Sequence, residues 1–170
     1  MHNKGVGLDV AGVVTAIGEG VRQFSIGDPV FGNTRGALAE FALCDVNHIT
    51  KKPPSLSFVE AAAIPTTYLT GYQALEGHRF QAGHKLLVIG ASGGCGTAGV
   101  HLGALMGADE IIGICSKKNE ELVRSAGASQ IIDYKTQDAR DVFGNGYFDF
   151  VYDTATASGA KEDYVKLSRS

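Results

Sequence analysis

The sequence predicts an α/β protein in which a parallel sheet follows a smaller β-rich segment, and three observations support this. A short apolar run at residues 86–89 ends in a glycine cluster at 90–96, which opens directly into a helix-period segment. Beyond Gly83, strand and helix patterns alternate, as in parallel sheets with right-handed crossovers. Before Pro65 the pattern is that of short β-branched strands punctuated by glycines. The second half is therefore expected to form part of a Rossmann-like, doubly wound parallel sheet.

The glycine cluster has the composition that a dinucleotide requires between a strand and a helix. Gly93 lets the backbone approach a pyrophosphate, because a Cβ there would collide with it, and Gly96 lets the helix pack on the strand. The helix N-terminus offers unpaired N–H groups and positive dipole charge to the phosphates. A plain glycine-rich turn is the alternative interpretation. The expected cofactor contacts here are Gly90, Ala91, Ser92, Gly93, Gly94, Cys95 and Gly96.

Four strands are expected in this half, at about residues 85–90, 110–115, 129–133 and 148–153, in the spatial order third, second, first, fourth. Helices are expected at about 94–106 and 117–126, with a weaker one near 136–143. His101 falls on the apolar face of the first of these helices, so we expect it to be a core or helix-packing histidine.

The first half contains short strand patterns at residues 10–17, 29–31 and 37–43, followed by an extended connector at 51–54. Ser57 and Glu60 have the spacing of a capping box and predict a helix that continues to Ala63. Pro65 ends that helix, and a second one is expected from about 66 to 76. We place the division at this point, with a partial β domain at residues 1–66 and a partial nucleotide-binding domain at 67–170.

Composition excludes several classes of protein. The chain of 170 residues carries a net charge of −3 with 19% charged residues, so neither nucleic acid nor an anionic membrane is an expected electrostatic partner. No apolar stretch reaches the ~18 residues of a membrane span. The three cysteines show no paired spacing, which is typical of reduced thiols, and no signal peptide is visible. These observations favour a cytoplasmic location.

Several separate motifs resemble those of the medium-chain dehydrogenase/reductases, in the quinone-oxidoreductase branch of that superfamily. The resemblance covers nearly the whole chain and implies that its first part forms a partial chaperonin-10-like β-barrel. The matching segments are GLDVAG at 7–12, GEGV at 18–21, FSIGDPV at 24–30, AEF at 39–41, AAAIP at 61–65, TGY at 70–72 and the turn at 90–96.

The resemblance also implies that no zinc is bound. Leu8 stands where the family's zinc enzymes have a histidine ligand, and Thr66 stands where they have a cysteine. Their four-cysteine lobe is replaced by the short turn at 33–35, and the five histidines are scattered.

The end of the second strand of the sheet predicts the cofactor NADPH. An acidic residue there would bind the ribose 2′-hydroxyl and repel a 2′-phosphate, but Glu110 lies at the opposite end of the strand. Related reductases use a tyrosine after the third strand, where Tyr134 stands, and a lysine at the position of Asn119. The expected contacts to the 2′-phosphate are Ser116, Lys117, Lys118 and Tyr134, with a solvated helix start as the alternative for the two lysines.

Without zinc, the hydride acceptor must already be activated, so a quinone or an α,β-unsaturated carbonyl is the expected substrate. The resemblance implies that Thr70 and Thr154 lie near the nicotinamide. The resemblance implies that the proton comes from water or from a hydroxyl. The candidate hydroxyls are those of Thr66, Thr67 and Tyr68, for which helix capping or packing is the alternative role. The second function class is a non-catalytic nucleotide-binding or interaction protein on the same scaffold.

Compared with the family, the chain is expected to lack strands at both ends, so an organelle-targeting peptide could also have been lost. The edge at 148–153 would then be unpaired and apolar at Phe148, Phe150 and Val151. We therefore expect a homodimer or self-association through this edge, and low turnover by the chain alone.

Overall fold

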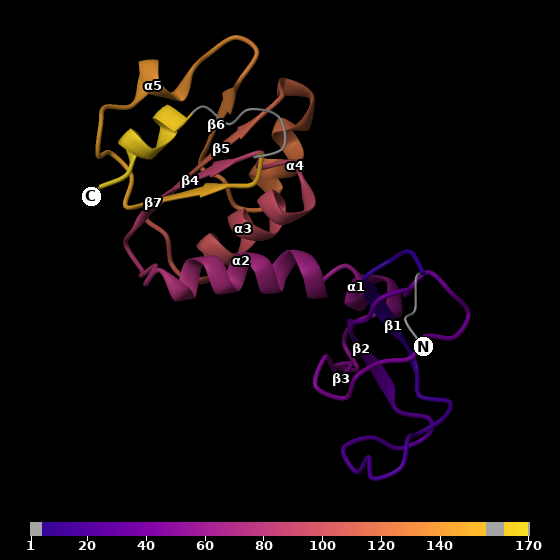
Figure 1. The fold of residues 1–170 in the computed structure, drawn as a ribbon. Coiled ribbons are helices and arrows are strands. Elements are labelled where there is room, and N and C mark those ends of the chain that lie inside the picture. The colour runs from indigo at the N-terminus through magenta and orange to yellow at the C-terminus, as the bar shows by residue number, and fades with distance from the viewer. Residues whose placement is uncertain (1–4, 156–161, 170) are drawn as a thin grey trace. The chain divides into compact units, whose positions relative to one another are not determined.

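The computed structural model describes residues 5–155 and 162–169, and the chain divides into two compact units, residues 1–69 and 70–170 (Figure 1). Helix α2 (Pro65–Gly77) begins in the first unit and continues in the second. Each unit contains its own sheet. The functional division expected between residues 66 and 67 stays a prediction.

The first unit contains a three-stranded antiparallel sheet in the order β1-β2-β3. Its strands are β1 (Asp9–Val13), β2 (Pro29–Asn33) and β3 (Ile49–Lys51). Helix α1 (Phe58–Ala62) follows, and the expected capping box is present: Glu60 N–H donates to Ser57 Oγ, and Ser57 N–H donates to the Glu60 carboxylate at 2.8 Å. The described residues of this unit do not close a barrel.

The prediction of a strand at 37–43 is wrong, and strand β3 was not predicted. Residues 37–43 are apolar except at Glu40, but Leu38 and Leu43 are 82% and 89% exposed, and in the described residues no strand pairs with this segment. A strand needs a partner for its backbone groups as well as a suitable pattern. Strand β3 has only three residues, too few for a pattern to be visible.

The second unit contains a four-stranded parallel sheet in the order β6-β5-β4-β7, which is the predicted order. Its strands are β4 (Lys85–Ile89), β5 (Glu110–Cys115), β6 (Gln130–Asp133) and β7 (Phe150–Asp153). The helices are α3 (Gly94–Leu105), α4 (Glu120–Ser125) and α5 (Ala139–Val142), with 3-10 turns η1 (Lys117–Asn119) and η3 (Glu162–Leu167). The helix expected over 117–126 is therefore a 3-10 turn followed by a short α-helix.

Both faces of this parallel sheet are covered, as a doubly wound fold requires (Figure 1). On one face, Leu75 of α2, Val100 of α3 and Val123 of α4 belong to one buried cluster. On the other face, Ala139 of α5 and Leu167 of η3 belong to a second buried cluster. The sheet strands are consequently apolar on both sides, which is why they appear in the sequence as continuous apolar runs.

Helix α3 packs on the sheet through its small residues. A Cβ built on Gly99 would lie 2.6 Å from the ring of Tyr152, so glycine permits this close approach. His101 is exposed and Leu105 is 80% exposed, so of the two roles predicted for His101 the core position is wrong, and a helix-packing role stays a prediction. The physical reason is that the face that approaches the sheet is the one with the least side-chain volume. Its buried members are Gly96, Ala98, Gly99, Val100 and Gly103.

The edge of the sheet at β7 is better covered than expected. Phe148 is fully buried, its N–H donates to Leu167 O at 2.9 Å, and its carbonyl accepts from Arg169 N–H at 2.7 Å. The prediction of an unpaired, exposed Phe148 is therefore wrong, because η3 and the residues after it return to this strand. Phe150 and Val151 are half-buried.

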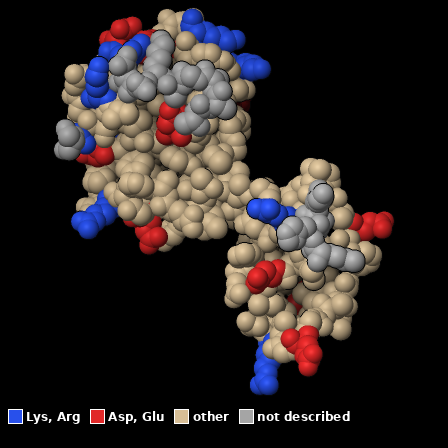
Figure 2. All heavy atoms as spheres, in the orientation of Figure 1, with Lys and Arg blue, Asp and Glu red and all other residues tan. Residues whose placement is uncertain are grey.

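The surface agrees with the low charge of the sequence. On the face shown in Figure 2, basic and acidic side chains are interspersed among other residues, and the described residues form no broad basic area there. No helix among the described residues has the length and apolar character needed to cross a membrane.

Candidate functional site

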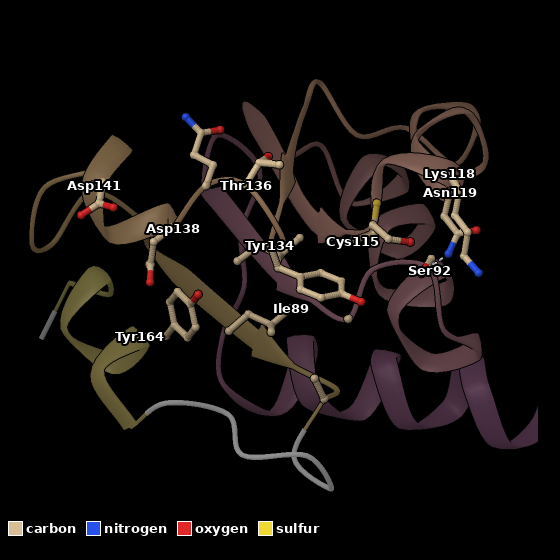
Figure 3. Close-up of a pocket in the computed structure, with 15 residues that line it drawn as sticks. Ile89, Ser92, Cys115, Lys118, Asn119, Tyr134, Thr136, Asp138, Asp141 and Tyr164 are labelled. Atoms are coloured by element: carbon tan, nitrogen blue, oxygen red, sulfur yellow. Dashed lines mark hydrogen bonds between the residues drawn. The ribbon is translucent and has the colours of Figure 1, made fainter.

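A cavity of about 1070 Å³ lies in the second unit, where the carboxyl ends of β4, β5 and β6 meet (Figure 3). This is the edge at which open parallel sheets bind ligands. Of the predicted cofactor contacts, five line the cavity: Gly90, Ser92, Ser116, Lys118 and Tyr134. Its other lining residues are Ile89, Ile114, Cys115, Asn119, Thr136, Gln137, Asp138, Asp141, Ala155 and Tyr164.

The glycine turn between β4 and α3 is held by close backbone contacts. Gly90 has a φ of +74°, and a Cβ there would lie 2.9 Å from Thr154 Oγ1. Thr154 Oγ1 in turn donates to Ile89 O at 2.7 Å, which ties the end of β7 to the turn. A Cβ on Gly96 would lie only 2.1 Å from Gly90 O. Glycine at 96 is therefore required for the helix to approach the strand, as the sequence predicted.

Gly93 differs from its neighbours because the protein leaves space beside it. The nearest atom to a Cβ built there is Gly90 O at 3.4 Å, which is an ordinary contact. Gly93 is also the N-cap of α3, a helix of 12 residues, and no side chain caps it. Packing therefore does not require glycine at 93. Open space at an uncapped helix N-terminus fits the diphosphate of a dinucleotide.

Several predicted residues support the turn without lining the cavity. Ala91 is fully buried, and its N–H donates to Ile114 O at 3.0 Å. Gly94 and Cys95 form the first turn of α3, and Cys95 is half-buried. Thr70 is exposed on α2.

Two helix-capping residues after β5 leave their helices uncapped. Ser116 is the N-cap of η1 and Asn119 is the N-cap of α4, yet neither side chain makes a capping hydrogen bond. Ser116 is only 6% exposed and lines the cavity. Asn119 Nδ2 instead donates to Ser92 Oγ at 3.0 Å (Figure 3). Both polar side chains are thus directed to the site.

The two neighbouring lysines are placed differently. Lys118 lines the cavity, whereas Lys117 forms an ion pair with Glu120 and its side chain is 77% exposed. The hydrogen bond from Lys117, followed by that from Arg124, holds the pKa of the Glu120 carboxyl below its usual value. Lys117 is therefore not among the residues that line the cavity. Glu110 lies at the amino end of β5, where it accepts from Tyr147 Oη at 2.7 Å, as expected.

Sequence reasoning missed part of the cavity. Thr136, Gln137 and Asp138 come from the β6–α5 connection, Asp141 comes from α5, and Tyr164 comes from η3. No signal in the sequence marks these residues, because only the parallel topology brings their loops to the same edge. Cys115 also lines the cavity, and burial raises the pKa of its thiol, so the thiol form is favoured.

The candidate proton donors lie in the first unit, and two of them already donate hydrogen bonds. Asp9 Oδ1 accepts from Thr66 Oγ1 at 2.6 Å, from Thr66 N–H at 3.0 Å and from Asn33 Nδ2 at 2.6 Å. Thr67 Oγ1 donates to Ala63 O, at the C-cap of α1, at 2.8 Å. Tyr68 is half-buried. The Asp9–Asn33–Thr66 cluster therefore fixes the first turn of α2 on strands β1 and β2.

No group of three or more His, Cys, Asp or Glu residues with metal-binding geometry is found in residues 5–155 and 162–169. Leu8, at the family's histidine position, is 55% exposed. Absence of bound zinc stays a prediction, which elemental analysis after dialysis against a weak chelator would check.

Comparison with known proteins gives the following likenesses. A 2-methylene-furan-3-one reductase of Solanum lycopersicum is 36% identical over 172 residues, which span 95% of this chain and 43% of the relative. The chloroplastic NADPH-dependent alkenal/one oxidoreductase of Arabidopsis thaliana is 32% identical, with the same coverage of 95% and 43%. The solved quinone oxidoreductase of Coxiella burnetii is 30% identical with a TM-score of 0.76, over 86% of this chain and 47% of that one. No protein-family model matches the chain.

The parallel sheet, the glycine turn and these likenesses define an oxidoreductase-type α/β fold. The chain belongs to the medium-chain dehydrogenase/reductase family, in the branch of the quinone oxidoreductases. It spans less than half the length of the relatives described above.

Proposed function

We propose that this chain is the cofactor-binding part of a reductase that transfers hydride from NADPH to a quinone or an α,β-unsaturated carbonyl compound. The observation that carries the proposal is the cavity at the carboxyl edge of the sheet. Its β5 side presents hydroxyl, ammonium and amide groups from Ser116, Lys118 and Asn119, and no carboxylate follows β5 until Glu120. The names of the relatives, which include an NADPH-dependent alkenal/one oxidoreductase, support the same reaction class.

The residues present fit this cofactor. The open space beside Gly93 and the N-terminus of α3 would hold the diphosphate, while Gly90 and Gly96 keep the turn close to the helix. Ser116 and Lys118 would hold the ribose 2′-phosphate, and Tyr134, which is 60% exposed, would pack beside it. Thr70 and Thr154 remain the proposed contacts near the nicotinamide.

When bound, NADPH would supply the hydride. A conjugated acceptor delocalises the resulting charge onto its oxygen, so a metal is not needed to polarise it. The protein must then provide orientation and a proton. Thr66, Thr67 and Tyr68 remain the proposed hydroxyl donors. Thr66 and Thr67 would first have to release the hydrogen bonds that they donate to Asp9 and to Ala63 O.

A non-catalytic nucleotide-binding protein is not favoured, because the relatives are named as reductases. A homodimer and a cytoplasmic location stay predictions; relatives with chloroplastic or mitochondrial names leave organelles open as locations.

The experiment that tests the proposal follows NADPH oxidation at 340 nm with an ortho-quinone and, separately, with an alkenal, using the full-length protein. Oxidation that requires the acceptor and is faster with NADPH than with NADH is expected. Absence of acceptor-dependent oxidation, together with absence of NADPH binding, would refute the proposal.

A further inference from the structure

The hydrogen bond between Asn119 and Ser92 joins two loops that are 27 positions apart in the sequence. Asn119 Nδ2 donates to Ser92 Oγ at 3.0 Å, and both residues line the cavity (Figure 3). Ser92 belongs to the glycine turn after β4, whereas Asn119 follows β5. The bond therefore connects the loop proposed to hold the diphosphate with the loop proposed to hold the adenosine ribose.

The position of Asn119 makes this contact unusual. Asparagine is among the best N-cap residues because its side-chain oxygen accepts from the first free N–H groups of a helix. Asn119 stands at the N-cap of α4 but is also the last residue of η1, its backbone is not extended (φ −105°, ψ 6°), and its side chain makes no such bond. The side chain instead turns to Ser92, so the local stability of α4 is not what this amide supports.

The chemistry of the pair determines what the Ser92 hydroxyl can do. A serine hydroxyl has one proton to donate and two lone pairs that accept. Because Asn119 donates to Ser92 Oγ, one lone pair is occupied, and the proton is directed away from the amide. Ser92 directly precedes Gly93, beside which the protein leaves open space at the N-terminus of α3. An anion in that space would accept a hydrogen bond from this hydroxyl.

We propose that Asn119 is a positioning residue that orients the Ser92 hydroxyl as a hydrogen-bond donor to the diphosphate of the bound dinucleotide. The inference rests on the proposed function. It separates the task of Asn119 from that of Lys118: the neutral amide supports the diphosphate, which NADPH and NADH share, and the cation supports the 2′-phosphate, which only NADPH has. Asn119 would thus raise the affinity for both cofactors without selecting between them.

The test measures the dissociation constants of NADPH and NADH, by fluorescence, for the whole chain and for five variants. Asn119→Ala and Ser92→Ala should each lower the affinity for both cofactors by about fivefold. The affinities of the double variant should be little lower than those of either single variant, because the two residues act as one unit. Asn119→Asp should lower the affinity for both cofactors at least as much, since a carboxylate would accept the hydrogen bond of the serine hydroxyl and would repel phosphate. Asn145→Ala, at an exposed turn before the amino end of β7, is the matched control.

The thermal midpoint of Asn119→Ala should stay close to that of the unmodified chain, because no capping bond is lost. Three results would overturn the inference: unchanged affinities, a loss confined to NADPH, or fully additive losses in the double variant. If the unmodified chain bound neither dinucleotide, the proposed function would fail, and the inference with it.

Discussion

The two adjacent lysines after β5 offer a sharp test, because the structure gives them different surroundings. Lys118 lines the cavity, whereas Lys117 is paired with Glu120. A lysine and a phosphate dianion about 4 Å apart in water attract each other by about 2 kcal/mol, and salt and side-chain freedom reduce this to about 1 kcal/mol. Lys118→Gln should therefore lower the affinity for NADPH by about fivefold and leave the affinity for NADH almost unchanged.

The assay is a fluorescence titration of both cofactors at one fixed ionic strength. Lys117→Gln removes the same charge one position away and should change the ratio of the two affinities by less than about twofold. Raising the salt concentration should reduce the NADPH preference of the unmodified chain more than that of Lys118→Gln. Equal losses in the two variants, or a larger loss with Lys117→Gln, would refute the assignment of Lys118.

Three further predictions rest on close contacts within the structure. Gly96→Ala should lower the free energy of unfolding by about 1–3 kcal/mol, because its Cβ would lie 2.1 Å from a backbone oxygen. Gly93→Ala should keep the stability of the unmodified chain in urea titrations and bind the cofactor about tenfold more weakly. A backbone N–H of β4 lowers the pKa of the Asp149 carboxyl in the folded protein, so the ionised carboxyl stabilises the fold above about pH 4. This stabilisation disappears as the pH falls through the lowered pKa of the folded protein. Asp149→Asn should therefore lose less stability in acid than the unmodified chain, as thermal melts at several pH values would show. Thr66→Val should lower stability by about 1–2 kcal/mol, because the hydroxyl no longer donates to Asp9 or accepts from Asn33. Unchanged melting would show that this cluster does not hold α2.

The parallel sheet could be predicted because its strands are buried on both faces and carry continuous apolar runs. The glycine turn was also predictable, since Gly96 is required by a contact that any such turn must make. Strand β3 and the irregular path of residues 37–43 could not be predicted, because backbone pairing between distant segments determines them.

The candidate site was predictable where its residues directly follow a strand, as Ser116 and Lys118 do. The different surroundings of Lys117 and Lys118 depend on the direction in which each side chain extends from η1. The proposed role of Asn119 depends on a partner 27 positions away in the sequence. Residues of the β6–α5 connection and η3 reach the cavity through topology alone.

The central claim is that the cavity at the carboxyl edge of the sheet binds the adenosine half of NADPH. The most direct measurement is a titration of the ¹⁵N-labelled chain with 2′,5′-ADP, followed by backbone amide NMR. The account predicts saturable shifts at Ser92, Ser116, Lys118 and Tyr134, with little change at Glu110 on the opposite edge. Saturable shifts confined to the Glu110 edge, or no shifts at all, would contradict it.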